Sequence, residues 1–312
     1  MHIFDGPRQR VCMGFVASAV FFVATSTHIA ADDASQRYTL QYKFLAAKNV
    51  AYSVENTSEV ELHQGGAEQH IEHSELTDKH YKVVSTDLNG SCVLELSIDR
   101  VRMSAAVDDG EAIKFDSQET KDAPPEFEGI TDTIGQPHIR VKVSPVGEVL
   151  SVQQLPEEKE QPVTAKNAGK LDVLVRLPDE PVAMGDIWKE RFEDEIIVDE
   201  QLRKAVTIQR TYTLKSVDGN RATIQLETSV ITPIREPEQE AQLIQKTPSG
   251  TIVFDIERGL LLSRETSLDR KVVGFSGPNS FIRNITTRHE RYVESESTGP
   301  IQQARDVKGI QR

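Results

Sequence analysis

Cysteine is almost missing from this chain, and so are the short motifs that identify common enzymes. Of the two cysteines in 312 residues, Cys12 lies in an apolar N-terminal segment, which leaves Cys92 alone in the rest of the sequence. A single cysteine excludes an internal disulfide, so the burial of apolar side chains must stabilise the fold. The sequence also lacks a glycine-rich phosphate loop, a His-Glu-x-x-His zinc motif and a Gly-x-Ser-x-Gly nucleophile motif. We therefore predict no catalytic residue, no metal site and no cofactor.

The long apolar run of this sequence occupies residues 11–25. It follows Arg8 and Arg10 and is followed by the small residues Ala30 and Ala31. A basic start, a short apolar segment and a small-residue end are typical of a secretory signal peptide, which we place at residues 1–31. An uncleaved membrane anchor is the alternative, because residues 11–31 could just span a bilayer. We predict an exported protein, periplasmic or extracellular, with no stable membrane insertion after signal cleavage.

Acidic residues outnumber basic residues after this segment. Removing residues 1–31 leaves 34 basic and 48 acidic residues, a net charge of −14. Such a negative field repels nucleic acid and anionic membrane surfaces. We therefore predict no nucleic-acid partner.

Alternation of apolar and polar residues is the strongest pattern that is present. In residues 204–230, Tyr212 and Leu214 precede an Asp218-Gly219 turn, and Ile224 and Leu226 follow it with the same spacing of two. This pattern predicts a long β-hairpin with one buried face. A similar hairpin is predicted around Gly90, and residues 38–44 alternate as a further strand. The predicted fold class is all-β, mainly antiparallel, with two short helices.

The order of these elements occurs twice along the chain. We predict a first β unit at 38–152, a linker at 153–170, a second β unit at 171–293 and a disordered tail at 294–312. Each unit contains a long hairpin and then a short amphipathic helix that begins at a proline, at 125–134 and 237–245. The interpretation is two related curved-sheet, or half-barrel, units. Chance similarity between alternating runs is the alternative.

A candidate ligand site is predicted from the apolar residues of the strands and of the two helices. A curved sheet has a concave apolar face, and a short helix against it either completes the core or acts as a lid. The candidate ligand-binding residues are Phe44, Tyr52, Phe127, Ile130, Trp188, Phe192, Tyr212, Leu243, Ile244 and Phe254. Ordinary core packing is the alternative role for them. The clustered histidines His63, His70, His73 and His80 do not converge at strand spacing, so we predict no metal site there.

Four segments carry a family resemblance. They are Tyr38-Thr39-Leu40-Gln41-Tyr42-Lys43-Phe44, Pro125-Glu126-Phe127-Glu128, Gly185-Asp186-Ile187-Trp188 and Val272-Val273-Gly274-Phe275-Ser276-Gly277-Pro278. With them the chain resembles a family of uncharacterised exported bacterial proteins. That family has no assigned activity, so the resemblance implies no catalytic residues. More distantly, the chain is similar to the half-barrels of periplasmic lipoprotein carriers, a likeness of fold only.

Our hypothesis from the sequence is an exported, non-enzymatic binding protein that holds a lipid or other hydrophobic ligand on a concave sheet face. The second hypothesis is a structural or protein-interaction module of the cell envelope without a small-molecule ligand. A hydrolase is the third, and it would require acidic neighbours around His70 or His138. The predicted partners are therefore a hydrophobic ligand or an envelope protein.

Overall fold

The structure, a computed structural model, describes residues 36–120, 122–156, 161–163, 172–199 and 202–294. The predicted signal peptide, most of the predicted linker at 153–170 and the predicted tail beyond Glu294 lie outside these residues. The described residues form one compact unit.

Antiparallel strands make up most of the described chain. In order, they are β1 (Asn49–Gln64), β2 (Ala67–Thr86), β3 (Cys92–Val107), β4 (Ile113–Asp116), β5 (Pro137–Val143), β6 (Val149–Gln154), β7 (Gln161–Pro162), β8 (Ile187–Ile197), β9 (Arg203–Asp218), β10 (Arg221–Val230), β11 (Ser249–Asp255), β12 (Leu260–Val273) and β13 (Phe281–Val293). Three short helices are described with them, the 3₁₀ helix η1 (Pro125–Thr133), the α-helix α2 (Pro237–Gln242) and the 3₁₀ helix η2 (Ile244–Lys246). The predicted all-β class with short helices is confirmed.

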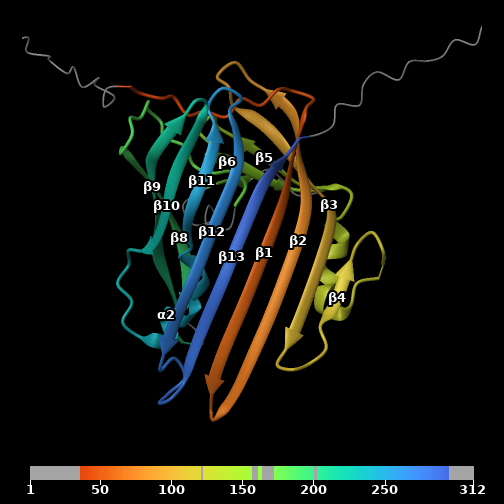
Figure 1. The fold of residues 1–312 in the computed structure, drawn as a ribbon, viewed down its shortest axis with the longest axis vertical. Helices are drawn as coiled ribbons and strands as arrows, with labels where there is room; N and C mark the ends of the chain where they lie inside the picture. The colour runs from red at the N-terminus through yellow and green to blue at the C-terminus, as the bar shows by residue number, and fades with distance from the viewer. Residues whose placement is uncertain (1–35, 121, 157–160, 164–171, 200–201, 295–312) are drawn as a thin grey trace, which may run out of the picture. The chain divides into compact units, whose positions relative to one another are not determined.

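These strands form a single open sheet in the order β7-β6-β5-β3-β2-β1-β13-β12-β11-β10-β9-β8, and β4 pairs with β3 beside this path (Figure 1). The first long strand pairs with the last, from Ala51 opposite Val293 to His63 opposite Phe281. Strands of both predicted units therefore belong to one sheet. In each half of the sequence, three long strands precede the helix and three strands follow it.

Glycines with positive φ form the turns of the predicted hairpins. Gly65 and Gly66, with φ of 63° and 82°, join β1 to β2, and Gly219, with φ of 57°, joins β9 to β10. Positive φ strains other L residues, whereas glycine adopts it freely. Across β9 and β10, Tyr212 lies opposite Leu226 and Leu214 lies opposite Ile224. All four side chains are buried, as the alternation predicted.

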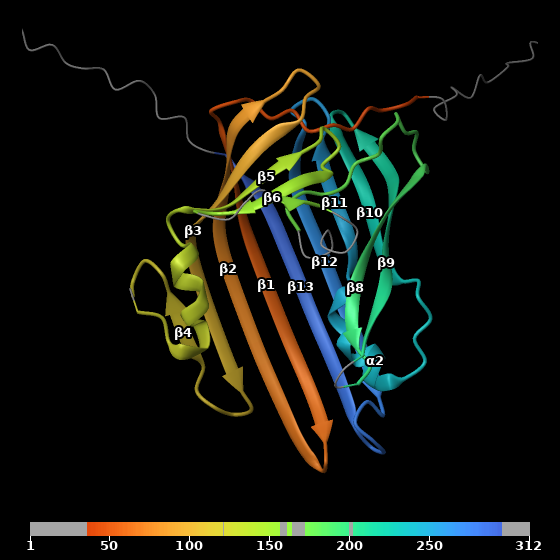
Figure 2. The ribbon, with the colours of Figure 1, turned by 180° about the vertical axis from the view of Figure 1, so that it is seen from behind.

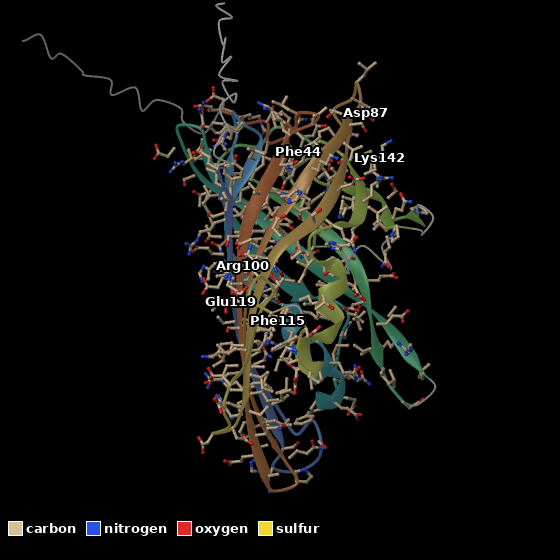
Figure 3. The ribbon with its side chains drawn as sticks, turned by 90° about the vertical axis from the view of Figure 1, so that its right-hand side faces the viewer. Phe44, Asp87, Arg100, Phe115, Glu119 and Lys142 are labelled. Carbon is tan, nitrogen blue, oxygen red and sulfur yellow. The ribbon has the colours of Figure 1, made fainter. Side chains whose placement is uncertain are left out.

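The helices all lie on one face of the sheet, which we call the inner face (Figures 2 and 3). Prolines begin both η1 and α2, where the missing N–H of a first-turn residue is not needed. The helix predicted at 125–134 is a 3₁₀ helix, because Phe127 and Ile134 donate to the carbonyls three residues earlier. The helix predicted at 237–245 is divided between α2 and η2.

The strand predicted at 38–44 is wrong as an element of the sheet. Residues 38–44 are extended but make only an isolated bridge, between Tyr38 and Val182. Their backbone N–H groups donate to turn carbonyls instead, from Tyr42 to Pro145 and from Lys43 to Gly259. Residues 36–48, which we call the strap, thus run across the end of the sheet where β1 begins (Figure 2).

Candidate functional site

The strap fills the end of the inner face that it crosses. Leu40, Tyr42 and Phe44 are buried in the main hydrophobic core, together with sheet residues and with Leu174, Val175 and Leu177 of the segment before β8. The Tyr42 hydroxyl donates to the carbonyl of Val175 and accepts from its N–H, both at 3.1 Å. The ring of Tyr42 also contacts Phe254 edge-on at 5.3 Å. We call this packed region the closed end.

Half of the predicted ligand-binding residues lie at the closed end. Phe44, Tyr52, Tyr212 and Phe254 are members of its core, and Trp188 packs against it. The rings of Trp188 and Tyr212 stack at 5.6 Å, and the indole N–H of Trp188 donates to the carbonyl of Arg176 at 2.9 Å. Phe44, Tyr52, Tyr212 and Phe254 are buried and Trp188 stacks on Tyr212, so the structure supports the core-packing role for these five side chains.

A layer of buried charge borders the closed end, and sequence reasoning missed it. Glu290 lies 2.8 Å from Lys79 and 2.6 Å from Arg264, and Arg264 makes two further contacts of 2.7 and 2.9 Å with Asp172. Two of these residues share the inner face with aromatic residues of their own strands, since Lys79 and Tyr81 are two apart on β2 and Glu290 and Tyr292 are two apart on β13. A charged residue two positions away from a buried aromatic residue of the same strand was the sequence signal that could have revealed the layer.

The charges of this layer hold one another in ionised form. Burial alone would raise the pKa of Glu290, but Arg264, Lys79 and Arg288 outweigh it and lower the pKa to about 2. Asp172 lies at the solvent-exposed border of the layer; partial desolvation opposes its ionisation, but Arg264 and Arg288 outweigh it and hold its pKa below the ordinary value. The layer is therefore charged at neutral pH.

Arg210 and Glu190 continue the layer toward the edge of the sheet. Their side chains are 3.4 Å apart, and the Tyr212 hydroxyl donates to Glu190 at 3.1 Å. The guanidinium of Arg210 also lies 4.8 Å from the ring centre of Phe192. The predicted ligand-binding residue Phe192 is thus buried beneath a cation.

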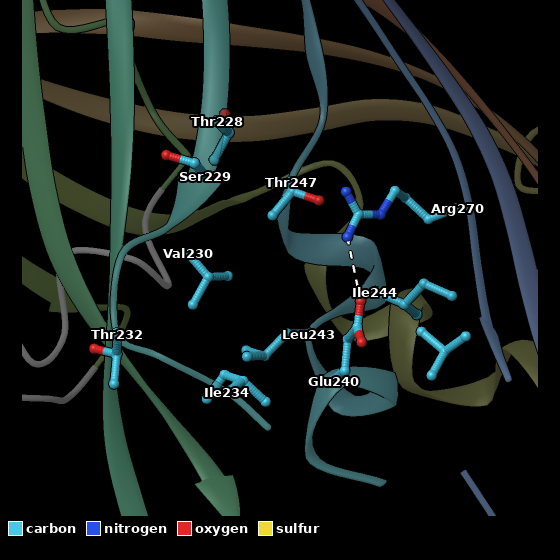
Figure 4. Close-up of a pocket in the computed structure, with 11 residues that line it drawn as sticks. Thr228, Ser229, Val230, Thr232, Ile234, Glu240, Leu243, Ile244, Thr247 and Arg270 are labelled. Carbon is cyan, nitrogen blue, oxygen red and sulfur yellow. Dashed lines mark hydrogen bonds and ion pairs between the residues drawn. The ribbon is translucent and has the colours of Figure 1, made fainter. Parts of the chain in front are cut away.

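Beyond the charge layer, the helix pair α2 and η2 covers a pocket of about 330 Å³, which we call the α2 pocket (Figure 4). This volume is at the lower end of the range for ligand sites, roughly 300–1,000 Å³. Its lining residues come from β10, β12, the two helices and the segment between β10 and α2: Thr228, Ser229, Val230, Thr232, Ile234, Glu240, Leu243, Ile244, Thr247, Arg270 and Val272.

The lining of the α2 pocket is amphipathic. Aliphatic side chains surround part of it, among them the predicted ligand-binding residues Leu243 and Ile244. Hydroxyl groups and the ion pair of Arg270 with Glu240 form the rest. The two charged groups of this pair are 3.4 Å apart, and both side chains are about half exposed (Figure 4). The ion pair therefore fixes the positions of the two side chains only weakly.

The remaining predicted site residues, Phe127 and Ile130, lie in η1 on the other side of the inner face. Phe127 is buried with its ring centre 6.4 Å from that of Phe115 on β4 (Figure 3), and Ile130 is half-buried. An open pocket of about 490 Å³ beside Phe115 is lined mainly by polar and charged residues. The structure therefore does not bring the residues of η1 together with Leu243 and Ile244.

The histidines of β1 and β2 do not form a metal centre. His70 and His63 face outward and pair with Glu72 at 3.2 Å and Glu68 at 3.3 Å. Among the residues that the structure describes, no group of three or more His, Cys, Asp and Glu side chains could hold a metal ion. Cys92 is buried, and burial raises its thiol pKa to about 12, so it is a packing residue rather than a nucleophile.

Part of the chain matches the model of a protein family. Residues 171–261 match DUF6263, a family of unknown function. The matched segment runs from the start of the second predicted unit to the beginning of β12, so it contains the α2 pocket only in part. The expected resemblance to a family without assigned activity is confirmed over these residues. No match to a curated protein was found.

Two solved structures match this chain with low similarity scores. A lipovitellin structure, described for its lipid–protein interactions, matches with a TM-score of 0.45 and 13% identity over 84% of this chain. This chain spans 26% of the lipovitellin chain. OccK7 (OpdD) of Pseudomonas aeruginosa matches with a TM-score of 0.21 and 8% identity, over 79% of this chain and 99% of that one. Likeness at this level carries no functional argument, and the likeness to lipoprotein carriers stays a prediction.

None of the described helices has both the length and the apolar character needed to cross a membrane.

Proposed function

We propose that this is an exported, non-enzymatic binding protein that holds a lipid or other hydrophobic ligand in the α2 pocket. The observation that carries the proposal is a partly open pocket of about 330 Å³ with an aliphatic wall, between the inner face of the sheet and a helix pair. Val230, Ile234, Leu243, Ile244 and Val272 provide that wall.

The attachment of the helix pair supports its role as a cover. The buried side chain of Leu243 packs against Ile196 and Val206, at the end of β8 and the beginning of β9. The Gln242 side chain donates to the carbonyl of Ile197 and accepts from its N–H, both at 2.8 Å. Both contacts lie at the junction of α2 and η2, so they hold the helix pair against β8 and β9, while Glu240, Leu243 and Ile244 of the pair line the pocket.

Native mass spectrometry of the protein purified from its own source tests the proposal. We expect a co-purified ligand mass on the wild type that Ile234→Trp removes by filling the pocket. The matched control is Ile231→Trp, because Ile231 is 42% exposed and three residues away from the pocket residue. A wild-type protein without ligand that also fails to bind added long-chain lipids would contradict the proposal.

The proposed export is supported by the pattern of residues 1–31. N-terminal sequencing of the mature protein is the test, with a start at Ala31 or Asp32 expected. A mature protein that retains Met1 would contradict signal cleavage.

A protein-interaction role is the second candidate, and the edge strand β8 favours it. Among the described residues, no strand pairs with the outer edge of β8, and Ile187 and Ile197 at its two ends are 59% and 51% exposed. An open edge of this kind can add a strand from a partner. Binding of an envelope protein that is lost in Ile187→Lys but kept in Ile234→Trp would favour this role over the pocket.

A further inference from the structure

Basic side chains outnumber acidic ones in the charge layer next to the α2 pocket. Arg210, Arg264 and Arg288 line a small cavity of about 50 Å³ at the layer, and Lys79 lies behind them. The carboxylates within 4 Å of these four cations are Glu190, Asp172 and Glu290. Among the described residues, four positive charges therefore face three negative ones on a mostly buried surface. One anion would balance the layer.

The unbalanced cation is Arg288. Arg264 is fully engaged, with contacts of 2.6 to 2.9 Å to Glu290 and Asp172. The guanidinium of Arg288, in contrast, is 3.6 Å from Asp172 and 3.8 Å from Glu290, which is longer than a hydrogen bond. Its close partner is the neutral Asn56 side chain, at 3.3 Å. The buried Nε–H of Arg288 has no hydrogen-bond partner among the described residues.

Thr228 connects this cavity to the α2 pocket. It lines both spaces, and its buried hydroxyl also has no hydrogen-bond partner among the described residues. A buried donor without a partner is costly, so two such donors beside one cavity indicate an acceptor that binds there. The cavity volume of about 50 Å³ compares with roughly 10–15 Å³ that is needed to hold one water molecule. A group as small as a carboxylate fits it.

We propose that the ligand of the α2 pocket is a carboxylate-headed amphiphile, such as a long-chain fatty acid, whose carboxylate binds Arg288 and Thr228. This inference rests on the proposed function and names its ligand class. The apolar chain lies along Val230, Leu243 and Ile244, while the carboxylate accepts from the Nε–H of Arg288 and from the Thr228 hydroxyl. The fourth positive charge of the layer is then balanced.

Calorimetric titration of the delipidated protein with dodecanoate and with dodecanol tests the assignment, because the two probes share one chain and differ in the head group. We expect the wild type to bind dodecanoate about tenfold or more tightly than dodecanol, since a charged acceptor strengthens a hydrogen bond. Arg288→Gln should lose most of that preference. Thr228→Val, which changes only the hydroxyl, should reduce the preference severalfold.

The matched control is Arg291→Gln, because Arg291 is exposed on the opposite face of the same strand. It should bind both probes as the wild type does. Equal affinity for the two probes, or a dodecanoate preference that survives both Arg288→Gln and Thr228→Val, would overturn the carboxylate assignment while leaving the pocket proposal in place. Binding of neither probe would contradict the proposed function itself, and the assignment with it.

Discussion

The two parts of the inner face are built from the same strands and differ in what covers them. At the closed end, the strap and the segment at 172–177 bury Tyr42, Tyr212 and Phe254 in one continuous core. Toward the other end of the same strands, a helix pair leaves a pocket of about 330 Å³ under Leu243 and Ile244. Alternation puts side chains on a face, but the covering segments decide whether that face is packed or available to a ligand.

The largest expected difference between the two parts is in their tolerance of truncation. Phe254→Ala, at a side chain with 0% exposure, should lower the free energy of unfolding by about 3–5 kcal/mol, because it leaves a cavity in a packed core. Val230→Ala in the α2 pocket should cost less than about 1.5 kcal/mol, because the side chain is only partly packed. Urea unfolding measures both. Equal losses would contradict a packed end and an open pocket.

The charge layer between the two parts should be the next most sensitive feature. Glu290→Gln removes the anion that Lys79 and Arg264 share, and loss of one partner from a buried pair costs about 3–5 kcal/mol. Glu265→Gln is the matched control, because Glu265 lies exposed on the outer face of β12 and should change stability by less than about 0.5 kcal/mol. If urea unfolding gave the two variants the same stability, Glu290 would not anchor the layer.

Acid should weaken the same layer. Because the folded state lowers the pKa of Glu290 to about 2 from 4.5, its ionisation stabilises the protein fully above pH 4.5. That contribution is lost as the pH falls from 4.5 toward 2. The stability difference between the wild type and Glu290→Gln should therefore shrink over this range in urea unfolding at each pH. A difference that stays constant or grows would show that Glu290 is not held ionised.

The smallest of these effects concerns how the strap passes over the sheet. A Cβ on Gly259, whose φ is 63°, would come within 2.5 Å of the Lys43 backbone nitrogen, whereas a Cβ on Gly219, whose φ is 57°, would meet no atom within 4 Å. Both alanine variants incur backbone strain of about 1 kcal/mol. Gly259→Ala should cost about 1–3 kcal/mol more, because it also displaces the strap. Equal thermal stabilities of the two variants would contradict close packing of the strap.

Alternation made most of the sheet predictable from the sequence. The spacing of Tyr212, Leu214, Ile224 and Leu226 predicted both the β9–β10 hairpin and its buried face, and prolines marked the beginnings of η1 and α2. The same pattern gave a wrong prediction of a sheet strand at 38–44. An extended segment that packs across hairpin turns has the same alternation of apolar and polar residues as a strand. Its partners, Pro145 and Gly259, are far away in the sequence, and local spacing carries no information about them.

The candidate site was predictable only in part. Leu243 and Ile244 line the α2 pocket as proposed, because an amphipathic helix directs its apolar side toward the sheet. The aromatic candidates lie instead in the closed end, because the segment before β8 covers them with Val175 and Leu177. Arg288 and Glu290 share the strand parity of Tyr292, but charges are usually solvated, and only the register of β13 against β12 brings Glu290 to Arg264.

Methyl NMR spectroscopy during a titration with dodecanoate tests the central claim, that ligand binds in the pocket and not in the core, most directly. We predict shifts of the methyl signals of Val230, Leu243 and Ile244, with those of Leu40, Leu214 and Ile224 at the closed end unchanged. The account would be contradicted if saturating dodecanoate shifted the methyl signals of the closed end. It would also be contradicted if dodecanoate shifted no methyl signal.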